Sequence, residues 1–240
     1  MLLQISLWGL SKVTIKLIGS KEINHLQQYQ NIIKEIKDLC VFEKRPEPTV
    51  VVVSKKQPIS KIKDLYSVGH RDFGENYAVE LAEKANILKE ECPEIRWHFI
   101  GQIQSNKIKV ILEHCSVFHS IYNSKHLKKI SELAKTKVHY FININLNQEP
   151  QKNGLGFEEA KEFYEAHGAL PNTRCLGLMS IPAAILTKNE QTSSYQELVA
   201  KAQQIGEGEV SLGMSGDYKA ALKAGSSYLR LGSLIMGERT

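Results

Sequence analysis

The sequence has few cysteines, and none of them form a CxxC motif. The four that are present, Cys40, Cys92, Cys115 and Cys175, are separated by long stretches of chain. Zinc ribbons and disulfide frameworks need closer and repeated spacings, so neither is indicated. The candidate site residues described below also contain no His, Asp and Glu cluster with metal-ligand spacing. We therefore expect a protein of a reducing compartment, the cytoplasm, without a metal site.

Long apolar runs and blocks of like charge are also missing. No run approaches the length of a transmembrane helix, so we expect no membrane span. The 31 basic and 26 acidic residues leave a net charge of only +5, and the lysines are spread along helical segments. This pattern does not indicate a nucleic-acid surface, although a small anionic ligand is compatible with it.

The first 23 residues have the least regular pattern. The opening MLLQISLWGL is apolar but short, with no preceding basic residue and no small-residue cleavage site. We therefore expect no signal peptide. Residues 1–23 are interpreted as an N-terminal extension, in which Val13, Ile15 and Leu17 alternate as in a short strand. Helical spacing begins after Asn24, a suitable N-cap, and residues 24–240 are predicted to form one domain.

The segment Thr49–Lys56, TVVVVSKK, carries the strongest signal in the chain. A run of β-branched residues this apolar predicts a strand buried on both faces, as in parallel sheets. A lysine at the end of such a strand can be partly desolvated and become nucleophilic. Taken alone, however, Lys55 and Lys56 are more simply explained as ordinary exposed lysines that mark the end of a core strand.

Eight strand candidates follow one another, each followed by a helix or by the end of the chain. This alternation predicts a parallel sheet, and eight units in this length favour a closed single-domain (β/α)8 TIM barrel. An open doubly wound sheet would need a glycine fingerprint after its first strand. The corresponding segment, VVVVSKKQP, contains no glycine.

In such a barrel the functional face is formed by the carboxyl ends of the strands. The residues predicted there are Lys55, Glu75, Asn76, His98 to Gln102, Ser120, Asn145, Met179, Ser180, Met214, Ser215, Gly232 and Ser233. The last two strand ends, SLGMSGD and RLGSLIMG, place small hydroxyl residues beside glycines at helix starts. Backbone N–H groups there can bind an anion, although Ser215 as a simple N-cap and Gly232 as a tight turn explain them equally well.

Two further side chains within strands are candidates. His98 lies between Trp97 and Phe99, where core packing is a more frequent role than general base. Arg230, between Leu229 and Leu231, is expected to point into the barrel, where a buried cation needs either a ligand acceptor or an acid from another strand. A strand-end lysine and a phosphate site together suggest a phosphorylated carbonyl ligand held as a Schiff base. Pyridoxal 5'-phosphate (PLP) fits both ends.

The motifs VVVSKKQP, HRDFGENY, WHFIGQIQSNK, GLMSIPA, SLGMSGD and YLRLGSLIMG, in this order and spacing, resemble the pyridoxal phosphate homeostasis protein family from about Asn24 to Gly237. The resemblance implies the barrel fold of the alanine racemase N-terminal domain and bound PLP. It implies that Lys55, rather than Lys56, forms the Schiff base. The other implied PLP-binding residues are Asn76 near the ring, Met179 and Ser180 lining the pocket, Met214, Ser215, Gly232 and Ser233 at the phosphate, and Arg230 facing the pyridine nitrogen. The family usually has threonine in place of Ser233 and phenylalanine near Met236.

The function implied by this resemblance is a non-catalytic PLP binder that acts in intracellular PLP homeostasis. We expect a cytoplasmic monomer whose partners are PLP itself and PLP-dependent apoenzymes. The alternative is a PLP-dependent amino-acid racemase. Alanine racemases carry an additional β domain that supplies a second base, for which this chain has no length. A third reading, an aldolase that uses Lys55, is discouraged by the resemblance.

Overall fold

The computed structural model describes residues 25–146, 152–181 and 188–238. Its strands are β1 (Thr49–Val53), β2 (Asp72–Glu75), β3 (Arg96–Phe99), β4 (Cys115–Ile121), β5 (Val138–Ile144), β6 (Thr173–Ser180), β7 (Glu209–Ser211) and β8 (Tyr228–Leu231). Its helices are α1 (His25–Phe42), α2 (Ile59–Ser67), α3 (Ala78–Leu88), α4 (Ile108–Leu112), α5 (Ser124–Leu133), α6 (Phe157–His167), α7 (Lys188–Ala202), α8 (Tyr218–Ala224) and α9 (Ser233–Met236).

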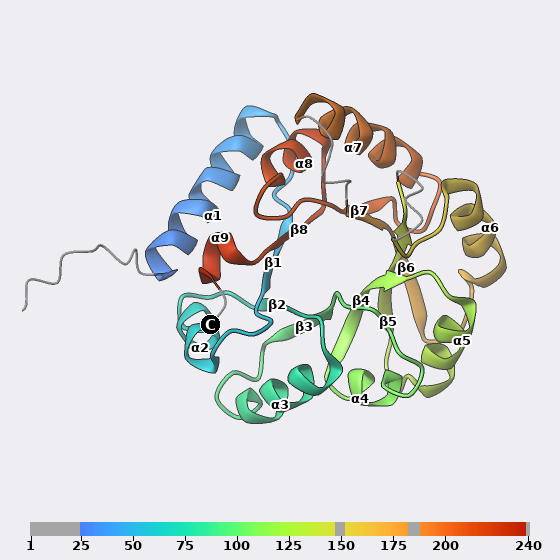
Figure 1. Ribbon diagram of the computed structural model, residues 1–240, viewed down its shortest axis with the longest axis horizontal. Helices are drawn as coiled ribbons and strands as arrows, with labels where there is room; N and C mark the ends of the chain where they lie inside the picture. Colours follow the sequence, from blue (N-terminus) through green and yellow to red (C-terminus); the bar gives the residue numbers. More distant parts are fainter. Residues whose placement is uncertain (1–24, 147–151, 182–187, 239–240) are drawn as a thin grey trace, which may run out of the picture.

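The strands form a closed barrel in sequence order, and β1 completes the circle by pairing with β8 in parallel. Figure 1 shows the helices as a ring outside the strands, with α9 beside α1. The register of the closing pair aligns Val51 with Arg230 and Val52 with Leu231. The predicted (β/α)8 barrel is therefore confirmed, and all strand ends on one rim come from different units of the chain.

Local sequence explains most element boundaries. Asn123 caps α5 by accepting hydrogen bonds from the backbone N–H groups of Lys125 and His126. Helix α8 ends at Gly225, whose φ of 102° is in the left-handed region that favours glycine. Strand β1 has its three central valines buried, as its branched composition predicts.

The residue pattern predicts a second strand at 70–74 and a long helix that runs to Ile205 and is ended by Gly206, and both boundaries differ from the structure. The second strand begins at Asp72 rather than His70, because the backbone N–H of His70 is bonded to the Leu65 carbonyl in the turn that closes α2. Helix α7 ends at Ala202 rather than Ile205, and Gly206 with φ 60° lies in the turn that follows. The predicted boundary of the extension at residue 24 and the alternating residues Val13 to Leu17 lie outside the described residues.

The barrel has an apolar outer layer, whereas its interior combines polar side chains with a small apolar cluster of Phe141, Leu176 and Met179. Leu229 and Leu231 are buried in the large cluster between strands and helices, whereas Arg230 between them is buried on the other face. Barrel interiors are more often filled by branched aliphatic side chains. None of the described helices has both the length and the apolar character needed to cross a membrane.

Candidate functional site

Lys55 lies in the turn directly after β1, at the rim formed by the carboxyl ends of the strands. Its side chain is half-buried, whereas the neighbouring Lys56 is exposed. Lys56 has a φ of 55°, so the chain turns sharply at this residue. The two lysines that the strand pattern could not separate therefore differ in environment, and Lys55 is the less exposed of the two.

The turn that carries Lys55 is anchored on both sides by a buried ionic network. Lys84 of α3 donates hydrogen bonds to the Ser54 carbonyl at 2.6 Å, to Glu75 Oε1 at 2.8 Å and to Glu80 Oε1 at 2.7 Å. The Ser54 hydroxyl donates to the same Glu75 oxygen at 2.7 Å. On the other side, the backbone N–H of Lys56 donates to Glu80 Oε1 at 2.5 Å. The backbone of Lys55 is thus held between two fixed neighbours.

The carboxylate of Glu75 is fully buried within this network. Its side chain is 0% exposed and that of Lys84 is 8% exposed. Burial raises the pKa of Glu75, and the hydrogen bonds from Lys84 and Ser54 oppose that rise only in part. A carboxylate in this position therefore depends on the Lys84 ammonium to remain charged.

The turn after β7 carries Met214 and Ser215, both half-buried. It begins at Gly213, whose φ is 86° and whose position leaves no space for a side chain, because a Cβ there would lie 2.6 Å from Ala221 Cβ. Asp217 fixes the turn by accepting the Met214 backbone N–H at 2.6 Å and the Tyr195 hydroxyl at 2.5 Å.

Ser215 also connects this turn to the end of β8. Its hydroxyl oxygen accepts the backbone N–H groups of Gly232 at 3.3 Å and Leu234 at 3.2 Å. Gly232 in turn lies against β1, since a Cβ there would be 3.5 Å from Val53 Cβ. The predicted phosphate residues, including the exposed Ser233, are therefore brought together, and they lie beside the strand that leads to Lys55.

Arg230 is 4% exposed and extends from β8 beneath this rim. Within the described residues its guanidinium donates to three neutral oxygens: the Ser211 carbonyl at 2.7 Å, the Ser211 hydroxyl at 2.6 Å and the Ser180 carbonyl at 2.9 Å. Burial lowers the pKa of Arg230 to about 10, which still leaves it charged at neutral pH. The predicted inward orientation is confirmed. The acid partner that was left open in the sequence is not among the described salt bridges.

Asn76 and Met179 line a hollow of about 330 Å³ at the same rim, together with Gln102, Tyr122 and Asn143. The Asn76 side-chain oxygen is buried and has no hydrogen-bond partner among the described residues. Close approach of the β3 turn holds Asn76 in place, because a Cβ on Gly101 would lie 1.9 Å from the Asn76 carbonyl oxygen. Ser180, by contrast, is fully buried, and its hydroxyl donates to the Ile144 carbonyl at 2.9 Å, so it contributes chiefly its backbone.

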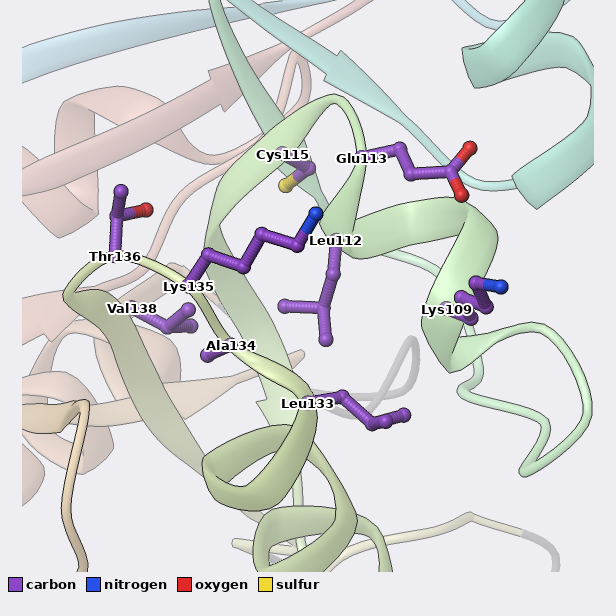
Figure 2. A pocket seen from close by; sticks show the side chains of 9 residues that line it. All are labelled: Lys109, Leu112, Glu113, Cys115, Leu133, Ala134, Lys135, Thr136 and Val138. Atoms are coloured by element: carbon purple, nitrogen blue, oxygen red, sulfur yellow. The ribbon is translucent and has the colours of Figure 1, made fainter.

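A larger hollow, of about 450 Å³, lies at the opposite end of the barrel between α4 and α5. Figure 2 shows Leu112 and Lys135 projecting into it, with Cys115 behind them. Cys115 is buried, with the carbonyls of Trp97 and Val117 both within hydrogen-bond distance of its single S–H, and burial raises the pKa of its thiol to about 12. This thiol is therefore a poor nucleophile. Among the described residues no group of His, Cys, Asp and Glu could hold a metal ion.

Sequence reasoning missed the groups that support the site from behind. For Lys84 the sequence does contain an indication of a buried role. It shares the apolar face of α3 with Leu81, Ala85 and Leu88, where a lysine needs a buried partner. For Ser211 and His119 the sequence contains no such indication, because the hydrogen bond between them joins β7 to β4 across the barrel and is not visible in a local pattern.

Known proteins share both sequence and fold with this chain. The family model of the alanine racemase N-terminal domain matches residues 29–240. The pyridoxal phosphate homeostasis protein of Vibrio alginolyticus is 37% identical over 203 residues, which are 79% of this chain and 86% of that protein.

Two solved structures show the same barrel. PipY of Synechococcus elongatus, determined with and without PLP, superimposes with TM-scores of 0.79 and 0.80 at 23% and 24% identity, over 89% of this chain and all of PipY. The alanine racemase of Clostridium difficile has a TM-score of 0.65 at 14% identity, over 88% of this chain but only 56% of the racemase. These two likenesses concern the fold, whereas the Vibrio relative and the family model establish kinship. The chain belongs to the pyridoxal phosphate homeostasis protein family, with the fold of the alanine racemase N-terminal domain.

Proposed function

We propose that this protein binds PLP at the rim of the barrel, holds it as a Schiff base on Lys55, and acts in PLP homeostasis without turnover of its own. The observation that carries the proposal is the placement of a half-buried lysine after β1 and a buried arginine on the adjacent β8, with a turn rich in backbone N–H groups beside them. An amine, a cation and anion-binding N–H groups are the complements of an aldehyde, a ring nitrogen and a phosphate.

The residues present fit this cofactor in two respects. The Asn76 side-chain oxygen is buried and meets no hydrogen-bond donor from the part of the chain that the structure describes, as expected of a group that faces a ligand. Among the described residues the Arg230 guanidinium is hydrogen-bonded to neutral oxygens, and the Asp217 carboxylate, which opposes the lowering of the Arg230 pKa by burial, forms no salt bridge with it. Donor capacity therefore remains for a ligand acceptor at the rim. We assign Asn76 and Met179 to the ring, Met214, Ser215, Gly232 and Ser233 to the phosphate, and Ser180 to the wall near Arg230.

The arginine supports a binding role over a catalytic one. PLP supplies an electron sink when its ring nitrogen is protonated. Arg230 can only donate a hydrogen bond, so a ring nitrogen that faces it stays unprotonated and the sink is weak. The name of the Vibrio relative, a homeostasis protein, points the same way.

The Schiff base is tested by reduction and mass spectrometry. Purified protein incubated with PLP is treated with borohydride, and peptide mapping is expected to place one pyridoxyl group on Lys55. The matched control is Lys56→Asn, because Lys56 is adjacent but exposed and asparagine tolerates its positive φ. Lys56→Asn should keep the adduct and Lys55→Ala should lose it. An unchanged adduct in Lys55→Ala would refute the assignment of the lysine.

The absence of turnover needs a separate measurement. A panel of L-amino acids is incubated with the PLP-loaded protein, and the appearance of D-enantiomers is followed by chiral chromatography. We expect none above the rate of free PLP. Racemization at enzyme-like rates would replace the homeostasis role with the racemase alternative.

Location and partners follow from the proposed role. A protein that regulates PLP is expected in the cytoplasm, as a monomer that passes the cofactor to PLP-dependent apoenzymes. Light scattering of the purified protein measures its molar mass and so tests whether it is a monomer. Loaded protein mixed with an apo-aminotransferase tests transfer, since activity should return faster than with an equal amount of free PLP. Equal or slower recovery would argue against delivery.

A further inference from the structure

A chain of hydrogen bonds crosses the interior of the barrel and ends at Arg230. The Arg230 guanidinium contacts the Ser211 hydroxyl at 2.6 Å, and Ser211 contacts His119 Nδ1 at 2.9 Å. His119 Nε2 lies 3.0 Å from His98 Nδ1, and His98 Nε2 lies 3.1 Å from Asp72 Oδ1. None of the five residues is more than 8% exposed. This hydrogen-bond chain therefore links strands β8, β7, β4, β3 and β2 within the barrel.

The far end of this chain is a fixed anion. Arg96 donates to both oxygens of Asp72, at 2.7 and 2.5 Å. Burial would raise the pKa of Asp72, but the hydrogen bonds from His98 and Arg96 outweigh it and hold that pKa well below its usual range. Asp72 is therefore an acceptor only. Burial lowers the pKa of His119, the next imidazole along, well below its usual range, so this ring is neutral at pH 7.

With both imidazoles neutral, every link has one possible direction. The Asp72 carboxylate requires a proton on His98 Nε2, which makes His98 Nδ1 an acceptor. His119 must then donate from Nε2, so its Nδ1 accepts the hydroxyl proton of Ser211. The lone pairs of Ser211 are left to face Arg230, which can only donate. The proton that His98 donates to Asp72 thus determines, through His119, that Ser211 presents its lone pairs to the guanidinium.

We propose that Asp72, His98, His119 and Ser211 are positioning residues for Arg230 and, through it, for the ring nitrogen of PLP. This role rests on the function proposed above. A barrel stabilised by packing alone would place aliphatic side chains here, whereas this interior holds two imidazoles whose four nitrogens are all hydrogen-bonded. Such a fully satisfied network holds its members in one arrangement, and the member nearest the rim is Arg230.

The direction of the chain is tested first in the cofactor-free protein. Long-range proton–nitrogen NMR of protein with labelled histidine should show His98 and His119 as neutral Nε2–H tautomers at pH 7.5, assigned from spectra of His98→Gln and His119→Gln. A proton on His119 Nδ1 would reverse the direction of the hydrogen bonds between His98 and Ser211 and would overturn the proposal. This readout does not depend on PLP binding.

The role toward PLP is tested by affinity and by the state of the ring nitrogen. Loss of a hydrogen bond to a charged group in Ser211→Ala should weaken PLP binding about tenfold. It should also shift the ring-nitrogen resonance of labelled PLP and the absorbance maximum. Ser211→Thr, which keeps the hydroxyl, should restore both, and His119→Phe should match Ser211→Ala. His114→Gln, a histidine outside the interior chain, is the control and should leave both unchanged.

The two proposals fail in different ways. If the wild-type protein takes up PLP on Lys55 but Ser211→Ala and His119→Phe bind it with wild-type affinity and an unshifted ring nitrogen, the positioning role is wrong and the binding function stands. If the wild-type protein does not bind PLP, both proposals are wrong. Circular dichroism of each variant confirms that the barrel remains folded.

Discussion

Replacing Lys84 by methionine removes the ammonium from the network behind Lys55 and leaves a side chain of similar length. Glu75 would keep the Ser54 hydroxyl as its hydrogen-bond donor, and its second oxygen is already buried with no hydrogen-bond partner in the described segments. The folded variant must either hold an uncompensated buried carboxylate or protonate it. Breaking a buried ion pair by removing one partner typically costs about 3 to 5 kcal/mol.

Protonation limits that cost and makes it depend on pH. A carboxyl with an ordinary pKa of 4.5 costs about 3 kcal/mol to protonate at pH 7, since each pH unit corresponds to about 1.4 kcal/mol. At pH 5 the same step costs less than about 1 kcal/mol. A carboxyl whose folded pKa is raised contributes stability below its unfolded pKa and loses it as pH rises. We therefore expect Lys84→Met to lower the free energy of unfolding by about 3 kcal/mol at pH 7 and by about 1 kcal/mol at pH 5.

Urea unfolding at pH 5, 6 and 7, followed by circular dichroism, measures this difference directly. The double variant Lys84→Met with Glu75→Gln is the control, because an amide carries no charge and its stability change should be nearly independent of pH. A loss below about 1 kcal/mol at pH 7, or a loss that does not shrink toward pH 5, would contradict the reasoning. PLP uptake by the same variants shows whether the turn of Lys55 needs the network.

Three further predictions concern stability. Burial lowers the pKa of His70 from 6.5 to about 4, so the stability that its neutral imidazole contributes is complete above pH 6.5 and is lost as pH falls toward 4. His70→Gln should therefore reduce the change in the free energy of unfolding over this pH range by about 3 kcal/mol. An unchanged pH dependence in urea unfolding would count against this prediction. Asn123→Ala removes the cap of α5 and should cost about 1 kcal/mol in urea unfolding, whereas no measurable loss would mean that the cap is redundant. Gly213→Ala combines a positive φ with a Cβ 2.6 Å from Ala221 Cβ and should cost about 2 kcal/mol, while wild-type stability would show that the turn readjusts freely.

The sequence predicted the architecture because each unit carries a local signal. The branched run of β1, the polar cap at Asn123 and the glycine after α8 act within a few residues, and a closed barrel follows from counting the units. The inward orientation of Arg230 was predictable for the same reason. Its neighbours Leu229 and Leu231 are expected to pack against the outer helices, and alternation along the strand then turns Arg230 into the barrel.

The supporting contacts of the site could not be predicted in this way. Ser211 is an unremarkable serine at the end of a short strand, and only the closed barrel brings it to His119, 92 positions away. His98 was interpreted as core packing; it does lie in the interior, but as a hydrogen-bonded member rather than an apolar filler. Strand patterns report which face a side chain occupies and not which partner it meets across the barrel.

The hydroxyl of Ser215 has a thermodynamic consequence for any phosphate bound at this rim. The Gly232 and Leu234 N–H groups already have an acceptor in the protein, at 3.3 and 3.2 Å. A phosphate that took these donors would displace that acceptor, so the free energy gained is the difference between two hydrogen bonds and not the whole of one. Release is eased equally, because the hydroxyl recovers the donors as the anion departs. Such an exchange of acceptors keeps both N–H groups paired before and after release, which is compatible with the reversible PLP binding that we propose.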